Sequence, residues 1–295
     1  MSVSRALPLQ LAGLLTATTL SACQEDAPSA PRDDAILEYV ALGDSYAAAP
    51  HLPADDLSAP CLRSETNYPS LVADRLTPIH LTDVSCVGAM SAHLTTPQES
   101  GDTLVRPQLD ALSEDTDLVT VTIGGNDKGL FPSWYHCRQL TSSDPKGSPC
   151  ADAHGEELLG LVSKIRRNLG AALAEIQRRA PDAVVIVATY PQVFPDEGTC
   201  ELASAYAKGD LAYINSIVDS LSDAMTAAAR EAGVAWVDVY EASRGHDVCS
   251  KDPWVNGFTQ EGTQDQTRAT ALHPFPEEQA AVARLILDML VLPEP

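Results

Sequence analysis

The chain has 295 residues, of which 44% are hydrophobic, and a formal net charge of −22 at pH 7. This length and apolar content suit one globular domain with a substantial core. The negative charge argues against nucleic acid as a partner, because phosphates require patches of Lys and Arg. It also argues against electrostatic adhesion to anionic lipid. We expect a monomer that binds no nucleic acid.

The N-terminal segment is typical of an export signal. Arg5 is its only charged side chain, and the mostly apolar stretch 6–20 that follows is too short to span a bilayer as a helix. Leu20-Ser21-Ala22-Cys23 then resembles the lipobox of bacterial lipoproteins, in which the cysteine is lipidated and becomes the mature N-terminus. The alternative is a plain secretory signal that is cleaved nearby.

These features predict three parts of the chain. Residues 1–22 are expected to be a lipoprotein-type signal peptide, and residues 23–35, rich in Pro, Ala and acidic side chains, a flexible tether. Residues 36–295 are expected to form the folded domain. The mature protein would therefore be extracellular or a lipoprotein of a bacterial cell envelope, held at the membrane through Cys23.

Apart from Cys23, the chain has an even number of cysteines, which in an exported protein favours disulfides over metal ligation. No Cys-x-x-Cys pair is present, and the histidines have no spacing to acids or thiols that is typical of zinc sites. We therefore expect neither a metal nor another cofactor. Several pairings are possible, and pairing in sequence order is the simplest: Cys61–Cys86, Cys137–Cys150 and Cys200–Cys249.

The hydrophobic pattern predicts strands that alternate with helices. Apolar runs typical of buried strands occupy 38–42, 79–84, 118–123, 183–188 and 234–239. The clearest helical stretches are 65–76, 155–180, 203–232 and 280–290. This alternation predicts a parallel sheet with helices on both faces. Two longer irregular stretches, 124–153 and 242–272, should border the edge of the sheet at which the strands end.

Polar motifs stand at three strand ends and before the last helix. They are Gly43-Asp44-Ser45, Cys86-Val87-Gly88-Ala89, Gly124-Gly125-Asn126-Asp127 and His273-Pro274. The carboxyl ends of parallel strands meet at one edge of a sheet, where open α/β folds build their sites. Each motif alone is ordinary turn chemistry. Their occurrence together and in this order indicates a catalytic site.

Together the four motifs resemble the four blocks of the SGNH hydrolases, also called the GDSL lipases and esterases. The resemblance covers residues 38–290, and it implies a three-layer α/β/α fold with a five-stranded, flavodoxin-like sheet in the order 2-1-3-4-5. It also implies hydrolysis of carboxylic esters through an acyl-enzyme. The family's Gly-Asp-Ser-Leu reads Gly43-Asp44-Ser45-Tyr46 here. The cysteines and the segment 245–249 also resemble those of secreted actinobacterial lipases.

The resemblance assigns a role to each motif. Ser45 would be the nucleophile and His273 the general base. The backbone N–H groups of Ser45 and Gly88 and the side-chain amide of Asn126 would form the oxyanion hole. Acyl transfer requires these three functions. An amide suits position 126, because it donates a hydrogen bond without adding a titrating charge.

The acid that usually completes the family's triad is missing. The family places Asp three residues before the histidine, and that position is Thr270 here. Some family members lack the acid and use a main-chain carbonyl to accept the Nδ1–H of the histidine. We therefore expect the carbonyl of Thr270 to orient His273. The alternative is a carboxylate from the preceding loop, Asp265 or Asp247.

The substrate is less well specified by the sequence. Loop residues expected near the site include eight apolar side chains, which could line an acyl groove or cover the core: Leu130, Phe131, Trp134, Tyr135, Val193, Phe194, Trp254 and Phe258. We predict a lipase or esterase, or a phospholipase, that acts on an ester or lipid substrate. The alternatives are a deacetylase or acyltransferase of envelope glycans, and a lipid-anchored binding protein without activity.

Overall fold

The structure is a computed structural model that describes residues 37–50, 60–263 and 267–291. The expected signal peptide, the expected tether with Cys23, and Asp265 lie outside the described residues. Among the described residues, none of the helices combines the length and the apolarity that crossing a membrane requires.

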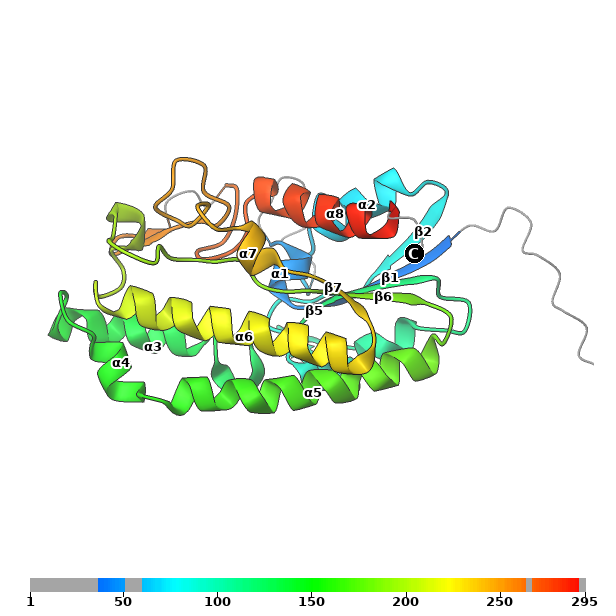
Figure 1. The fold of residues 1–295 in the computed structure, drawn as a ribbon, viewed down its shortest axis with the longest axis horizontal. Coiled ribbons are helices and arrows are strands. Elements are labelled where there is room, and N and C mark those ends of the chain that lie inside the picture. Colours follow the sequence, from blue (N-terminus) through cyan, green and yellow to red (C-terminus); the bar gives the residue numbers. More distant parts are fainter. Residues whose placement is uncertain (1–36, 51–59, 264–266, 292–295) are drawn as a thin grey trace, which may run out of the picture. The chain divides into compact units, whose positions relative to one another are not determined.

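A parallel five-stranded sheet forms the centre of the fold (Figure 1). Its strands run in the order β2-β1-β5-β6-β7, which confirms the predicted flavodoxin-like order. The two neighbours of β1 end close to Gly43, which pairs with Thr122 of β5. The strands are β1 (Leu37–Gly43), β2 (Ile79–Asp83), β5 (Leu118–Thr122), β6 (Val184–Ala188) and β7 (Ala235–Val237).

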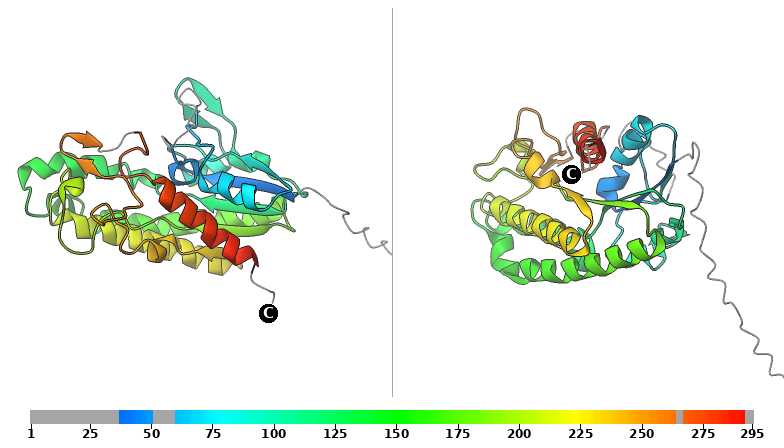
Figure 2. Two further views of the ribbon diagram at one scale, coloured as in Figure 1. Left: turned by 90° about the horizontal axis from the view of Figure 1, so that it is seen from above. Right: turned by 45° about the vertical axis from the view of Figure 1, so that its right-hand side comes forward.

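Helices cover both faces of the sheet, as predicted (Figures 1 and 2). Helices α5 (Glu157–Arg179) and α6 (Asp210–Ala232) pack together on one face, and α2 (Tyr68–Arg75) and α8 (Pro276–Val291) on the other. Successive strand residues point to opposite faces. Val40 and Leu42 therefore belong to the core under α5 and α6, whereas Tyr39 and Ala41 belong to the core under α2 and α8.

The structure contains short elements that the sequence pattern did not predict. The stretch 124–153 was expected to be irregular but includes two short helices, α3 and α4. Few of their side chains are buried, so they leave little apolar periodicity in the sequence. Other unpredicted elements among the described residues include a hairpin that projects from the sheet (Figure 2), short pieces of helix and strand, and short 3₁₀ helices. The bounds are α1 (Ser45–Ala48), β3 (Gln98–Ser100), β4 (Thr103–Val105), α3 (Ser133–Leu140), α4 (Pro149–His154), α7 (Val239–Ala242), β8 (Phe258–Thr259) and β9 (Gly262–Thr263).

The three predicted disulfides are present: Cys61–Cys86, Cys137–Cys150 and Cys200–Cys249. The second joins α3 to α4, and the third fastens the loop after α7. Cys137, Cys150 and His154 lie close enough together to suggest metal ligands. However, the two sulfurs are bonded to each other and therefore offer no thiolates.

Candidate active site

Ser45 stands at the carboxyl end of the central strand β1, as the first residue of α1. The turn before it requires glycine, because a Cβ at Gly43 would lie 2.6 Å from the carbonyl oxygen of Thr122. The side-chain amide of Gln108 accepts from the N–H of Gly43 and donates to its carbonyl oxygen, each at 2.8 Å. Asp44 caps α1 and accepts from the N–H of Tyr46 at 3.0 Å. Hydrogen bonds therefore fix the turn both before Ser45, at Gly43, and after it, at Tyr46.

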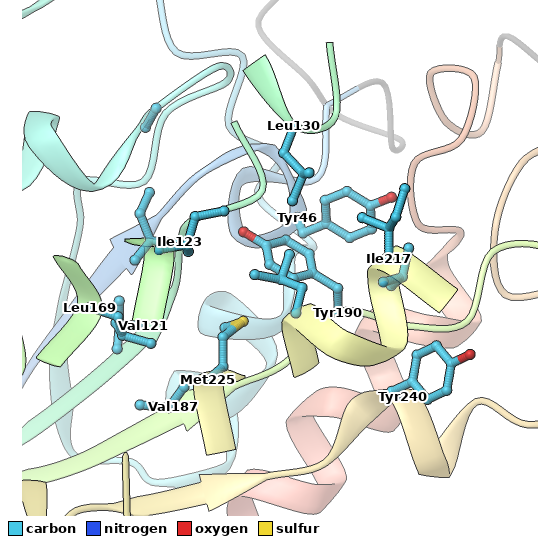
Figure 3. Packing of buried hydrophobic residues seen from close by; sticks show 14 of the residues in the cluster. Tyr46, Val121, Ile123, Leu130, Leu169, Val187, Tyr190, Ile217, Met225 and Tyr240 are labelled. Carbon is cyan, nitrogen blue, oxygen red and sulfur yellow. The ribbon is translucent and has the colours of Figure 1, made fainter. Parts of the chain in front are cut away.

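A buried phenol joins this turn to the third motif. Tyr190 donates its hydroxyl proton to Oδ2 of Asp44 at 2.5 Å and accepts from the N–H of Gly125 at 2.8 Å. Burial raises the pKa of Asp44 to about 7, and the hydrogen bond from Tyr190 acts in the opposite direction. Figure 3 shows the ring of Tyr190 beside that of Tyr46, and the two centroids lie 5.1 Å apart.

Ser45 and His273 lie within hydrogen-bond distance of each other, although 228 residues separate them in the sequence. Nε2 of His273 is 2.8 Å from Oγ of Ser45, and Nδ1 is 2.9 Å from the carbonyl oxygen of Ala271. A carbonyl can only accept a hydrogen bond, so Nδ1 carries the proton and Nε2 accepts from the serine hydroxyl. This is the tautomer that a general base requires.

The carbonyl that faces the imidazole belongs to Ala271 and not to Thr270, so this prediction was wrong by one residue. The carbonyl of Thr270 accepts instead from the backbone N–H of His273 at 3.1 Å and closes a tight turn. Within that turn Leu272 adopts a left-handed conformation with φ of 61°. This reversal of the backbone brings the Ala271 carbonyl next to the imidazole.

The two loop carboxylates that we considered as alternatives have different outcomes. Asp247 is buried, and its Oδ1 accepts from the backbone N–H of Cys249 at 2.8 Å. It therefore braces the turn beside the third disulfide. Asp265 lies outside the described residues.

The two other expected oxyanion donors border the same site. Gly88 has a φ of 74°, a conformation in which glycine is strongly favoured, and it is exposed. Asn126 donates one amide proton to the carbonyl of Ala89 at 3.0 Å, which fixes the orientation of the amide and leaves its second proton for a ligand. Gln98 donates to the carbonyl of Val87 at 2.8 Å and thereby orients the peptide group that carries the Gly88 N–H.

A cavity of about 180 Å³ connects these groups. Ser45, Gly88, Asn126 and His273 supply its polar lining, and most of the remaining wall is aromatic or aliphatic. The apolar part consists of Tyr46, Val87, Phe131, Pro132, Trp134, Tyr135, Ala271 and Leu272. A larger cavity of about 560 Å³ between α2 and α8 contains none of the expected site residues.

The eight loop side chains that we considered as an acyl groove divide into two groups. Phe131, Trp134 and Tyr135 line the cavity. The others are occupied elsewhere: Leu130, Val193 and Phe194 are buried in the core, Trp254 stacks on His246, and Phe258 packs against Arg138.

Three residues that support the site were missed at the sequence level, namely Gln98, Gln108 and Tyr190. Only Tyr190 carries a usable signal, because it lies two residues after β6 at the edge of the sheet where sites form. Gln98 lies in β3 and Gln108 begins a short 3₁₀ helix; the sequence pattern predicts neither element, and nothing in the spacing of the glutamines indicates their role.

Comparison with known proteins agrees with this geometry. Residues 41–280 match the GDSL-like Lipase/Acylhydrolase family. Lipase 2 of Streptomyces coelicolor is 41% identical over 246 residues, which cover 80% of this chain and 79% of that protein. A lipase of Streptomyces rimosus is 32% identical over 260 residues, covering 88% and 90% of the two chains.

A solved structure extends the likeness to three dimensions. The crystal structure of phospholipase A1 from Streptomyces albidoflavus NA297 superposes with a TM-score of 0.71 at 27% identity, covering 86% of this chain and 99% of that one. The chain therefore belongs to the GDSL-like lipase/acylhydrolase family and is a hydrolase of carboxylic esters.

Proposed function

We propose that Ser45 attacks the ester carbonyl carbon while His273 accepts its hydroxyl proton. The observation that carries this proposal is the 2.8 Å contact between Oγ and Nε2, with the imidazole oriented by the Ala271 carbonyl. The resulting oxyanion would receive hydrogen bonds from the N–H groups of Ser45 and Gly88 and from the amide of Asn126.

The same histidine serves both halves of the reaction. Its imidazolium donates the proton to the departing alcohol when the ester C–O bond breaks, which leaves an acyl-enzyme on Ser45. Nε2 then takes a proton from water, and the hydroxide attacks the acyl carbonyl carbon. Collapse of the second tetrahedral intermediate releases the carboxylic acid and returns the proton to Ser45. The neutral Ala271 carbonyl keeps the histidine tautomer fixed, but it stabilises the imidazolium less than a carboxylate would.

We propose lipid esters as the substrate class, because the cavity wall beyond the polar groups is aromatic and aliphatic. The relatives named as lipases and a phospholipase A1 support the same choice. A cavity of about 180 Å³ is small, so it should enclose only the carbonyl end of an acyl chain. Tyr135, which is 58% exposed, lies at the rim of this cavity, where it would contact the rest of the acyl chain. Glycan deacetylation is less well supported, because sugar hydroxyls require more polar partners than this lining offers.

We propose that the exported protein is anchored through a lipidated Cys23. The three disulfides support export, because such bonds form in oxidising compartments. Replacing Cys23 with Ala should move the protein from the membrane fraction to the medium. Retention of the Cys23→Ala variant on membranes would contradict the anchor but leave the enzymatic proposal untouched.

A chain-length series tests the proposed activity. Purified mature protein should hydrolyse p-nitrophenyl esters and phospholipids, and it should prefer both over acetylated glycans. Ser45→Ala should lower kcat by about 10⁶-fold, the order found when a catalytic serine is removed, with an unchanged melting temperature. Turnover by the Ser45→Ala variant at the wild-type rate would overturn the mechanism, and faster cleavage of glycan acetates would overturn the substrate class.

A further inference from the structure

Tyr46 stands where the family motif has leucine, immediately after the proposed nucleophile. Its side chain is 4% exposed, and its hydroxyl donates to the carbonyl oxygen of Leu272 at 2.6 Å. This contact joins residues that are 226 positions apart in the sequence. A leucine at position 46 could not make it.

The accepting carbonyl belongs to the peptide group that carries the N–H of His273. That N–H donates to the carbonyl of Thr270, so the same peptide group is held at its oxygen by Tyr46 and at its nitrogen by Thr270. The N–H of Leu272 also donates to the carbonyl of Asn256 at 3.0 Å. These bonds hold Leu272 in its left-handed conformation, which costs a residue with a Cβ on the order of 1 kcal/mol or more.

The ring of Tyr46 contacts the imidazole directly. The two rings are stacked with centroids 5.4 Å apart and an interplanar angle of 29°. Tyr46 is itself fixed, because its N–H is bound by Asp44 and its carbonyl oxygen accepts from Gln279 at 3.0 Å. One rigid residue thus touches the histidine side chain and the backbone that carries it.

We propose that Tyr46 is a positioning residue for the general base, acting through the Leu272 carbonyl and the imidazole face to keep Nε2 of His273 directed at Ser45. This inference rests on the proposed function of Ser45 and His273. Burial raises the pKa of Tyr46 well above its ordinary value, so the phenol remains a neutral donor at any pH at which the enzyme works.

The proposal has a consequence that a purely structural role lacks. The imidazolium must protonate an alkoxide leaving group, whereas p-nitrophenolate leaves without a proton. A displaced His273 should therefore slow acylation by an alkyl ester more than acylation by the p-nitrophenyl ester of the same acid. The ratio of the two kcat/KM values reports this difference, because the acyl group and its binding are common to both substrates.

The experiment compares two Tyr→Phe variants, each of which loses one buried hydroxyl. Tyr46→Phe should lower kcat/KM for the alkyl ester on the order of 10-fold or more, and for the p-nitrophenyl ester by clearly less, with KM nearly unchanged. Tyr39→Phe is the matched control, because the Tyr39 hydroxyl bonds to Oγ1 of Thr120 within the sheet at 2.8 Å. Tyr39→Phe should change kcat/KM for the two esters by the same factor. Tyr46→Leu, which restores the family residue, should show the same selective loss as Tyr46→Phe.

Equal losses on the two esters, or losses no larger than those of Tyr39→Phe, would overturn the proposal. Unfolding of both Tyr46 variants, measured by circular dichroism, would assign the residue to the stability of the fold and overturn it as well. Failure of the proposed function would look different, because Ser45→Ala would then retain wild-type turnover of both esters.

Discussion

The two halves of the site are held in different ways. The nucleophile turn, residues 43–46, directly continues the central strand and is fixed by the sheet, by Gln108 and by the cap on α1. The histidine turn, residues 270–273, belongs to a long loop and is held by hydrogen bonds to Asn256 and Tyr46. The nucleophile turn is thus anchored in the central sheet, whereas the histidine turn is anchored in a loop and in the side chain of Tyr46. Mutations should separate the two cases.

After the loss of the nucleophile itself, the largest expected effect concerns Asn126, the oxyanion donor that stands beside both turns. Asn126→Ala should lower kcat by about 10²–10³-fold, because one hydrogen bond to the transition-state oxyanion is lost. The loss should appear in kcat and in kcat/KM to the same extent, as steady-state kinetics with one ester can show. A variant that changes only KM would place Asn126 in ground-state binding instead.

A pair of amide deletions compares the two turns directly. Asn256→Ala removes the 2.7 Å bond from Nδ2 to the Ala269 carbonyl beside the histidine turn, and it should lower kcat on the order of 10-fold. Gln108→Ala leaves the buried N–H of Gly43 unpaired and should lower the free energy of unfolding by about 1–3 kcal/mol. Kinetics and urea denaturation of both variants give the comparison.

We express the decrease in kcat as an increase in the activation free energy, so that it can be compared with the decrease in the free energy of unfolding. For Asn256→Ala we expect the first quantity to be larger, and for Gln108→Ala the second. If both variants lost stability and activity in the same proportion, there would be no difference between the way the sheet holds the nucleophile turn and the way the loop holds the histidine turn.

Two buried carboxyl groups give the next test, Asp44 in the nucleophile turn and Glu278 on α8. Burial raises the pKa of Glu278 on α8 from 4.5 to about 8, and its described hydrogen bond comes from the amide of its neighbour Gln279. Between these pH values the folded protein holds a proton that the unfolded chain lacks, so unfolding releases it. The free energy of unfolding must therefore decrease as the pH rises through this window.

Glu278→Gln removes the contribution of Glu278 to the pH dependence of the free energy of unfolding. The contribution of Asp44, whose pKa is raised in the same direction, remains. The melting temperature of the wild type should therefore decrease more between about pH 5 and about pH 9 than that of the variant. Calorimetry of both proteins across this range provides the measurement. Parallel pH profiles would show that Glu278 does not titrate in this window.

The smallest effect is expected at Asp247. Its carboxylate accepts from the N–H of Cys249, so Asp247→Ala should reduce stability by about 1 kcal/mol and leave kcat within a factor of about three. Activity and melting temperature of the variant test this. A loss of kcat by orders of magnitude would show that Asp247 supports the base.

The same contrast explains which features were predictable from the sequence. The strands and the main helices were predicted because buried strands and amphipathic helices leave periodic patterns. The order of the strands in the sheet came from the resemblance to the SGNH hydrolases. The roles of Ser45, Gly88 and Asn126 also came from that resemblance, and their positions in the segments that follow β1, β2 and β5 agree with it. The orienting carbonyl was assigned one residue too early, because the left-handed conformation of Leu272 decides which carbonyl faces the imidazole. A residue with a Cβ gives no sign of such a conformation in the sequence.

The supporting residues were less predictable for a related reason. Gln108 and Tyr190 each act through two hydrogen bonds to groups that lie more than sixty residues away in the sequence. Such contacts leave no periodicity, and each residue alone is compatible with an ordinary buried position. Short helices such as α3 are similarly hidden, because their few buried side chains form no repeat.

Covalent labelling of Ser45 tests the central claim most directly. An alkyl fluorophosphonate reacts with a serine whose proton is taken by a neighbouring base, and it leaves a stable phosphonyl ester. Intact mass spectrometry and peptide mapping should find one phosphonyl group on Ser45 in the wild type, none in Ser45→Ala, and much slower labelling in His273→Ala. Labelling at another residue, or continued ester hydrolysis by fully labelled protein, would contradict Ser45 as the nucleophile.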